Sequence, residues 1–381
     1  MITRALYNSA PGVARRTRGS TVGKIRQATS RRHHARVTIS DVAVRAGVSP
    51  MTVSRVINSE DNVRDSTRAA VDAVIRELRY SPNRAARSLA SGHQIQVCLL
   101  YANPSSTYLS ATLLGALEQA RENDTQLVVA ECDGEADAER TIKDQLRGGI
   151  SGFLLVPPLA DSLDLLNLLK ERGVPTVTMG PPLLGERISS VMIDDRSAAR
   201  TMTEYLIGLG HRRIGFITGN PKYLVSEARK SGYRDALEAA GIEWRPELVA
   251  TGGFSYRSGL DAANRLLALA EIPTAISASN DEMAAAVISV AHRHHIDVPG
   301  DLTVTGFDDT LLATMVWPQI TTIRQPISDM SHAAIDLLTR SIRASRAGFD
   351  TECEHLTLDY SLIERESSAP PARRVPRDRI G

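Results

Sequence analysis

The sequence predicts a small all-α unit followed by an α/β core of two lobes. Apolar residues recur with the period of helices up to residue 80, and short apolar runs alternate with helical stretches beyond residue 93. The charge changes in the same region, because the net charge of +1 hides +11 over residues 1–95 and −10 over the rest. We expect five segments: a basic, disordered extension (1–36), a helical unit (37–80), a short helix with a linker (81–93), the core (94–366) and a disordered tail (367–381).

The first 36 residues contain nine Lys and Arg and no acidic residue, and no helical or strand period organises them. This composition is typical of a disordered tail, or of a start codon placed too far upstream. Two alternatives remain open. The segment could be a basic arm that adds affinity for phosphates or, ranked last, an organelle transit peptide.

Two short helices joined by a tight turn are predicted next. The first, over 39–46, has apolar residues at i, i+3, i+4 and i+7. Thr38 and Asp41 can form a capping box at its start, and Gly47 can end it in the left-handed conformation. Ser49 is then the N-cap of a second helix, with Pro50 at its first position.

The second helix has two distinct faces. Val53, Val56 and Ile57 point inward, toward a third helix that we expect over 65–79. Two helices joined by a glycine-containing turn form a helix-turn-helix, whose second helix can read base edges in the major groove. The shape also occurs without DNA, but the basic charge favours DNA binding. The residues that point outward together are Met51, Ser54, Arg55 and Asn58.

The core alternates strands and helices, which is typical of parallel βαβ units. Two doubly wound lobes with several crossovers would place a ligand cleft between them. Strands are expected over 96–102, 126–132, 152–157, 175–180 and 190–195 in the first lobe, over 212–219, 247–254, 274–279, 302–309 and 320–326 in the second, and near 355–363 at the end.

Several function classes are excluded. No apolar run reaches the ~18–20 residues of a membrane span and no secretory signal is recognisable, so we expect a cytoplasmic protein. Cys98, Cys132 and Cys353 lack disulfide or zinc spacing and are expected to be reduced. Dinucleotide, phosphate-loop, zinc-protease and serine-hydrolase motifs are missing, and the Asp308–Asp309 pair fits a strand-end turn better than catalysis. We expect no enzyme, no cofactor and no metal site.

Three motifs carry a family resemblance. They are DVAxxAGVSxxTVSRV over 41–56, the pair Thr67 and Arg68, and YxPNxxARSL over 80–89. On these motifs, residues 38–92 closely resemble the DNA-binding headpiece of the lactose-repressor (LacI/GalR) family of bacterial transcription regulators. A looser resemblance to the effector-binding core of that family, which is similar to periplasmic sugar-binding proteins, continues to about residue 366.

The resemblance implies base-reading roles on the second helix. Pro50 and Met51 stand where the family selects its operator sequence, and Arg55 stands at a further reading position, where a guanidinium can pair bidentately with guanine. Because Pro50 and Met51 are poor hydrogen-bonding groups, most discrimination is expected from Arg55. Met51 could alternatively just cap the small core. The residues expected at bases or phosphates around it are Ser49, Thr52, Ser54 and Asn58.

The segment 82–90 is too short to persist alone as a helix in water. In the family, two such hinge helices, one from each subunit, fold in the minor groove of the operator. The resemblance implies that Leu89 is the wedge that kinks the duplex, beside Arg84 and Arg87. A plain flexible linker is the alternative.

The resemblance also implies an effector site between the lobes. Tyr108 and Phe254 match aromatic pocket positions, Arg229 a ligand-clamping arginine and Asp281 a hydroxyl-binding acid, while Asp194 is a weaker candidate. This set suits a carbohydrate, although a purine or another small polar metabolite would fit nearly as well. Alternatively, Arg229 could pair with Asp281, Phe254 could belong to the core and Tyr108 could cover a loop. The segment 103–107, NPSST, departs from the NPFF-like sequence that is more usual in the family.

Together these features predict a sequence-specific DNA-binding transcription regulator, a repressor, whose operator affinity responds to a small-molecule effector of the carbohydrate class. We expect a homodimer on a palindromic operator, associated with the nucleoid. The main alternative is a cytoplasmic sugar-binding sensor without operator-specific binding, and a sugar-processing enzyme on a similar sheet ranks behind it.

Overall fold

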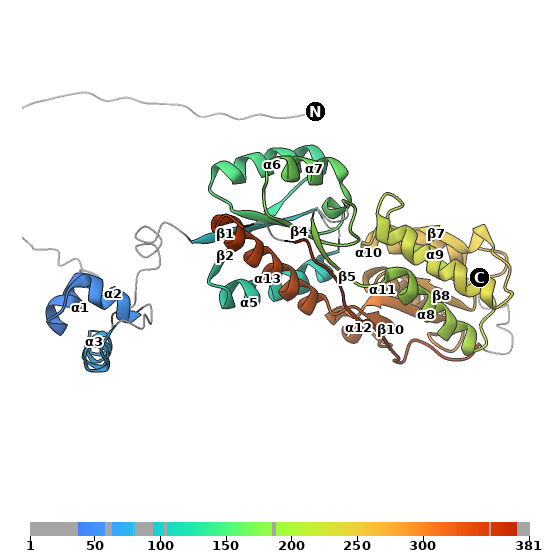
Figure 1. Cartoon of the computed structure of the whole chain (residues 1–381). Helices are drawn as coiled ribbons and strands as arrows, with labels where there is room; N and C mark the ends of the chain where they lie inside the picture. The colour runs from blue at the N-terminus through green and yellow to red at the C-terminus, as the bar shows by residue number, and fades with distance from the viewer. Residues whose placement is uncertain are drawn as a thin grey trace, which may run out of the picture. The chain divides into compact units, whose positions relative to one another are not determined.

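A computed structural model describes residues 37–57, 63–78, 80, 94–102, 105–184, 188–349 and 352–371. The chain divides into two compact units, Met1–Ala90 and Ser91–Gly381 (Figure 1). Each is described by itself below.

The described residues of the N-terminal unit form three helices, α1 (Ile39–Ala46), α2 (Pro50–Ile57) and α3 (Asp65–Glu77). The predicted capping box is present, since the Thr38 N–H donates to Asp41 Oδ2 at 2.8 Å and the Asp41 N–H donates to Thr38 Oγ1 at 3.4 Å. Gly47 ends α1 with φ 68°, in the left-handed conformation that glycine adopts without strain. The buried residues of this unit are Val42, Ala43, Val53, Val56 and Val71.

Two six-stranded sheets form the core of the second unit, one in each lobe (Figure 1). The first has the order β11-β5-β4-β3-β1-β2 and is parallel throughout. The second has the order β12-β10-β9-β8-β6-β7 and is parallel except where β12 joins β10. The strands are β1 (Ile95–Tyr101), β2 (Thr125–Glu131), β3 (Gly152–Leu155), β4 (Thr176–Met179), β5 (Ser189–Met192), β6 (Ile214–Thr218), β7 (Val249–Thr251), β8 (Ala275–Ala278), β9 (Thr303–Asp308), β10 (Thr321–Arg324), β11 (His355–Thr357) and β12 (Ser361–Ile363).

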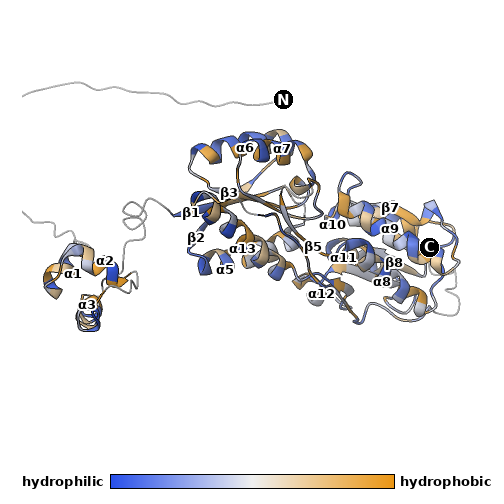
Figure 2. Cartoon of the chain, viewed as in Figure 1, coloured by the Kyte–Doolittle hydropathy of each residue, from blue (hydrophilic) through white to orange (hydrophobic). Residues whose placement is uncertain are grey.

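Helices cover both sheets, and orange and blue alternate along them in Figure 2, as expected when one helix face is buried. In the first lobe α13 packs against α5 and the first sheet, while α8 packs against α9 in the second. Gly232 lets α8 and α9 approach, because a Cβ there would lie 2.0 Å from the Arg196 carbonyl oxygen. The helices are α5 (Ser106–Glu122), α6 (Glu135–Arg147), α7 (Leu163–Glu171), α8 (Asp195–Gly208), α9 (Leu224–Ala239), α10 (Tyr256–Leu267), α11 (Asp281–Arg293), α12 (Leu311–Met315) and α13 (Ile327–Arg346).

The chain crosses between the lobes after β5, after β10 and between β11 and β12. The single strand expected near 355–363 is therefore wrong. β11 pairs with β5 in the first sheet, whereas β12 pairs with β10 in the second. A continuous strand pattern cannot reveal that its two halves join different sheets, because both halves alternate in the same way.

Residues 367–371 were expected to belong to a disordered tail, and this is also wrong. Ser367 is fully buried, and its Oγ accepts the Thr321 N–H at 2.8 Å and donates to the Val304 carbonyl at 2.5 Å. Two residues on, the Ala369 carbonyl contacts His211 Nε2 at 2.9 Å. The core therefore extends at least to residue 371, beyond which the structure describes nothing.

These contacts make Ser367 a stability determinant. Ser367→Ala leaves a buried N–H and a buried carbonyl without this partner, and we expect it to lower the free energy of unfolding by about 1–3 kcal/mol, measured by urea denaturation. The exposed Ser361→Ala in β12 is the matched control and should change it by less than about 0.5 kcal/mol. Equal values for the two variants would contradict the assignment.

Candidate functional site

The second helix of the N-terminal unit presents an exposed face. Val53 and Val56 are buried beneath α2, while Met51 is 66% exposed and Arg55 is exposed beside it. The Arg55 guanidinium contacts Met51 Sδ at 3.8 Å, one turn away. Met51 therefore does not cap the small core, which was the alternative considered for it.

The start of α2 is built as the sequence predicts. Ser49 Oγ accepts the Thr52 N–H at 3.1 Å, so Ser49 is the N-cap, and Pro50 is the first residue of the helix. Thr52 and Ser54 are half-buried at the edge of the exposed face. Four residues that were expected to contact DNA lie outside the described residues, namely Asn58, Arg84, Arg87 and Leu89.

The second unit contains a cavity between its two lobes, at the carboxyl ends of the strands. It is lined from the first lobe by residues such as Ser105 and Tyr108, and from the second by Arg229, Phe254 and Asn280. Apolar groups complete the wall: Pro157, Met179, Met192, Ile193, Val225 and Met330. Ligands of doubly wound sheets bind at this end of the strands.

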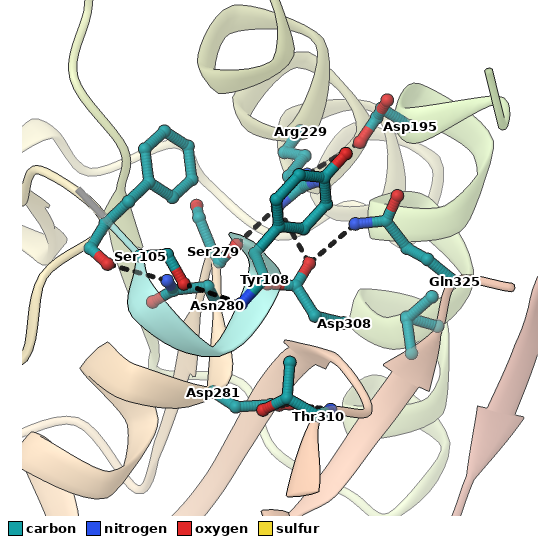
Figure 3. Close-up of polar contacts among 12 residues, drawn as sticks. Ser105, Tyr108, Asp195, Arg229, Ser279, Asn280, Asp281, Asp308, Thr310 and Gln325 are labelled. Carbon is teal, nitrogen blue, oxygen red and sulfur yellow. Dashed lines mark hydrogen bonds and ion pairs between the residues drawn. The ribbon is translucent and has the colours of Figure 1, made fainter. Parts of the chain in front are cut away.

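Arg229 is the central charged group of the cavity (Figure 3). Its Nε donates to Asp195 Oδ1 at 2.7 Å and its Nη1 donates to the Ser279 carbonyl at 2.5 Å, while Nη1 lies 3.8 Å from Asp308 Oδ1. The guanidinium carbon lies 3.7 Å from the centre of the Phe307 ring. Arg229 is only 5% exposed, so acceptors and an aromatic face hold its charge in a fixed position. The alternative pairing of Arg229 with Asp281 is not what the structure contains.

Asp195 and Asp308 line the cavity, although neither was predicted as an effector-binding residue. Burial raises the pKa of Asp308 to about 7, against the opposing effects of Arg229 and of the amide of Gln325, which donates to Asp308 Oδ1 at 2.6 Å. Burial also raises the pKa of Asp195, which Arg229 partly offsets. Perturbed acids that face a cavity are typical of functional sites.

Two predicted acids have other positions. Asp281 is fully buried outside the lining of the cavity, where Oδ2 accepts the Thr310 N–H at 2.7 Å and Oδ1 accepts the Thr322 hydroxyl at 2.7 Å. Asp194 is the N-cap of α8, and its carboxylate accepts the N–H and the hydroxyl of Ser197 at 2.9 and 2.6 Å. The carboxylates of both residues are therefore used within the fold, and their neighbours Asn280 and Asp195 line the cavity instead.

The two predicted aromatic residues do line the cavity. Tyr108 is buried in the first lobe, and burial raises the pKa of its hydroxyl. Phe254 also belongs to the core of the second lobe and stacks on Tyr223, with ring centres 6.0 Å apart and planes 3° apart. Stacked rings offer a flat apolar surface at one side of a polar cavity.

Backbone strain gathers at the same place. Phe254 has φ 62° and Asp308 has φ 107°, in a region of backbone conformation that residues other than glycine rarely adopt. Each such residue costs of order 1–3 kcal/mol and persists where its surroundings hold it in place. The Asn280 side-chain amide does this for Phe254 by donating to its carbonyl at 2.8 Å. A sequence pattern gives no warning of this strain.

Other types of site are not found in the described part of the chain. It contains no group of three His, Cys, Asp or Glu residues that could hold a metal ion. Asp309, the second acid of the pair noted in the sequence, forms ion pairs at 2.6 Å with Arg324 and Arg365. Within the same residues, no helix is long and apolar enough to cross a membrane.

Comparisons with known proteins find a known family in each of the two units. The family described as "Bacterial regulatory proteins, lacI family" matches residues 38–83, and "Periplasmic binding protein-like domain" matches residues 203–368. The HTH-type transcriptional regulator CelR of Thermobifida fusca is 37% identical over 343 residues, which cover 87% of this chain and 98% of CelR.

Two solved structures are similar to most of the chain. A complex of the transcriptional regulator CelR with cellobiose has 34% identity and a TM-score of 0.65, covering 87% of this chain and 100% of that one. The lac repressor dimer bound to operator and the anti-inducer ONPF has 27% identity and a TM-score of 0.73, covering 87% and 99%. Because the match to CelR extends over nearly the full length of that regulator, the chain belongs to the LacI/GalR family of bacterial transcription regulators.

Proposed function

We propose that this chain is a transcriptional repressor that binds a palindromic operator as a homodimer. A small carbohydrate raises or lowers its affinity for that operator. The observation that carries the DNA-binding part is the exposed face of α2, with Met51 and Arg55 side by side above buried valines. A sugar sensor without DNA binding would have no use for a complete, capped helix-turn-helix. We propose that the protein acts in the cytoplasm, on the nucleoid.

Arg55 is the main reader of base edges. Its guanidinium can donate two parallel hydrogen bonds to O6 and N7 of guanine, whereas the thioether of Met51 offers only an apolar surface for a thymine methyl group. The contact between Met51 and Arg55 limits the directions that the guanidinium can take. The two residues therefore act as one reading surface.

An apolar surface in the second unit supports dimerisation. Leu311, Met315 and Trp317, in and just after α12, are each more than 70% exposed. Exposed large apolar residues that lie close together typically mark protein interfaces. The lac repressor, which this chain resembles, is a dimer on its operator. We propose that a second copy of the chain covers this surface.

The cavity fits an uncharged molecule rich in hydroxyl groups. Asp195 and Asp308 can accept hydroxyl hydrogens, the Arg229 fork can donate, and the Tyr223–Phe254 stack can cover the C–H face of a sugar ring. The positive charge of Arg229 is already matched by Asp195, so the described lining offers little to a phosphate group. The related CelR was solved with cellobiose, an uncharged sugar.

Arg55→Ala should lower operator selectivity while retaining much of the nonspecific affinity. Loss of a bidentate contact is worth about 1–3 kcal/mol of discrimination, so the ratio of operator to random-duplex affinity should fall about 5- to 150-fold for each of the two half-sites. The ratio is measured by gel shift at fixed salt, with an operator obtained by in vitro selection. Arg76→Ala in α3 removes the same charge from an exposed position and should preserve the ratio. An unchanged ratio in Arg55→Ala would refute the assignment.

Arg229→Lys should abolish the response to the effector without removing operator binding. A lysine cannot reproduce the fork that meets Asp195 and the Ser279 carbonyl. The response is the change in operator affinity on adding a sugar first identified by a thermal-shift screen. Arg234→Lys, on the exposed side of α9, is the matched control and should respond as wild type. If Arg229→Lys also responds normally, the cavity is not the effector site.

Asp308 should make stability depend on pH. Its pKa is about 7 in the folded protein and near 3.8 in an unfolded chain, so between these values only the folded state holds the proton, and stability falls as pH rises. Asp308→Asn removes this titration. Its free energy of unfolding relative to wild type should rise from about pH 4 to 7 and then level off. A difference for Asp308→Asn that does not change with pH would contradict the burial of an ionisable acid.

A further inference from the structure

We infer that Glu282 is a positioning residue that latches the two lobes together at the wall of the effector cavity. Glu282 lies in the first turn of α11, in the second lobe, and is only 7% exposed. Its Oε1 accepts hydrogen bonds from the first turn of α5 in the other lobe, namely from Ser105 Oγ at 3.0 Å, Thr107 Oγ1 at 3.1 Å, the Thr107 N–H at 3.2 Å and Ser106 Oγ at 3.4 Å.

The charge of Glu282 suits this position. The first N–H groups of a helix lack partners within the helix, and together they give its start a partial positive charge. The starts of α5 and α11 are brought together here, so a carboxylate between them offsets both. A neutral side chain of the same length could accept hydrogen bonds but would not provide this charge.

The hydroxyl groups on the other side of the latch explain a peculiarity of the sequence. Ser105 and Ser106 stand where the NPFF-like pattern has its two aromatic residues, and Thr107 follows them. All three side chains donate to the same carboxylate oxygen. Aromatic side chains at positions 105 and 106 could not donate to Glu282, so two of the hydrogen bonds depend on the serines that this chain has there.

The latch lies directly at the cavity. Ser105 and Tyr108 line it from the first lobe, and Asn280, two residues before Glu282, lines it from the second (Figure 3). Separating the lobes would break the hydrogen bonds of Glu282 and would also remove Tyr108 from its place opposite Arg229. Opening of the cavity and release of the latch are therefore the same movement.

A second contact of the same type has the opposite sense. Asp161, in a short 3₁₀ turn (Leu159–Asp161) of the first lobe, accepts the N–H of Leu224 at the start of α9 at 3.0 Å. Leu224 lies between Tyr223 and Val225, which both line the cavity. Each lobe thus supplies one carboxylate that meets a helix start of the other lobe. Glu282 accepts more hydrogen bonds from the other lobe than Asp161 does.

The regulatory consequence rests on the proposed function. An effector that prefers separated lobes must break the hydrogen bonds of Glu282, whereas an effector that prefers closed lobes is helped by them. The latch itself can be tested without effector or DNA. We use the full chain carrying Cys353→Ser and two spin labels on exposed helices, at Asn167→Cys in α7 and Asp261→Cys in α10. Cys98 and Cys132 are buried and remain in place. Labelled protein is diluted with unlabelled protein so that distances between subunits are rare.

Pulsed electron paramagnetic resonance then measures the distance between the two spin labels, one on each lobe. Wild type should give one narrow distribution, and Glu282→Ala a broader one with a longer mean. Glu282→Gln should lie between the two, because it keeps the acceptor and loses the charge. Thr107→Val should broaden the distribution slightly and add little to Glu282→Ala, since both changes remove the same contact. The control Glu238→Ala, which loses an exposed ion pair within one lobe, should match wild type.

A distribution in Glu282→Ala that matches wild type, in protein with a normal melting transition, would overturn the inference. If Glu282→Ala does not fold, Glu282→Gln and Thr107→Val decide it in the same way, and wild-type distributions for both would overturn it. The result does not depend on the proposed function, because a chain that binds no operator still reports the distance between its lobes. Conversely, loss of operator selectivity in Arg55→Ala would stand whatever Glu282 does.

Discussion

The buried guanidinium of Arg229 is the group on which the arrangement of the core depends. A charge removed from water must be matched, since an unmatched one destabilises a fold by about 3–5 kcal/mol. Arg229 is matched by Asp195 at the start of α8 and by the Ser279 carbonyl after β8, with Asp308 at the end of β9 nearby. These contacts tie three separate parts of the chain to α9 at one point, and that point is the wall of the cavity.

Helix starts present the same problem in a weaker form, and the fold solves it with carboxylates. Asp194 meets the start of α8, Asp161 meets that of α9 and Glu282 meets that of α5. Two of these three contacts join the lobes. The positive ends of the helices around the cavity are therefore already compensated, and the polar groups that remain suit hydroxyl groups better than they suit an anion.

In the N-terminal unit, the residues that hold α2 in place and the residues proposed to contact DNA lie on opposite faces of the same short helix. Val53 and Val56 hold α2 against its neighbours, while Met51 and Arg55 lie on the opposite face with no part in the buried core. Because the two faces share only the helix backbone, the residues that we propose read the operator can differ between relatives without disturbing the fold. This is the physical basis on which a family of one architecture can address many operators.

The sequence by itself determined the local features of this protein. The capping box of Thr38 and Asp41, the left-handed Gly47 and the exposed face of α2 depend only on near neighbours in the chain, and all three were predicted. Most strands of both lobes were predicted as well, because strands buried on both faces of a parallel sheet are short continuous apolar runs in the sequence. Tyr108, Arg229 and Phe254 were also placed at the cavity, through family resemblance, and the structure has them there.

Three features depend on tertiary packing. They are which acid faces the cavity, which sheet each of the last two strands joins, and the burial of the chain around Ser367. Successive residues of a helix point about 100° apart, so packing against the rest of the fold determines whether Asp194 or Asp195 faces inward. Asp281 is likewise bound by Thr310 and Thr322, from segments far away in the sequence. The division between β11 and β12 and the burial of Ser367 have the same origin, because each depends on partners more than 35 residues away. Such partners are brought together by the fold and leave no mark in the local pattern of residues.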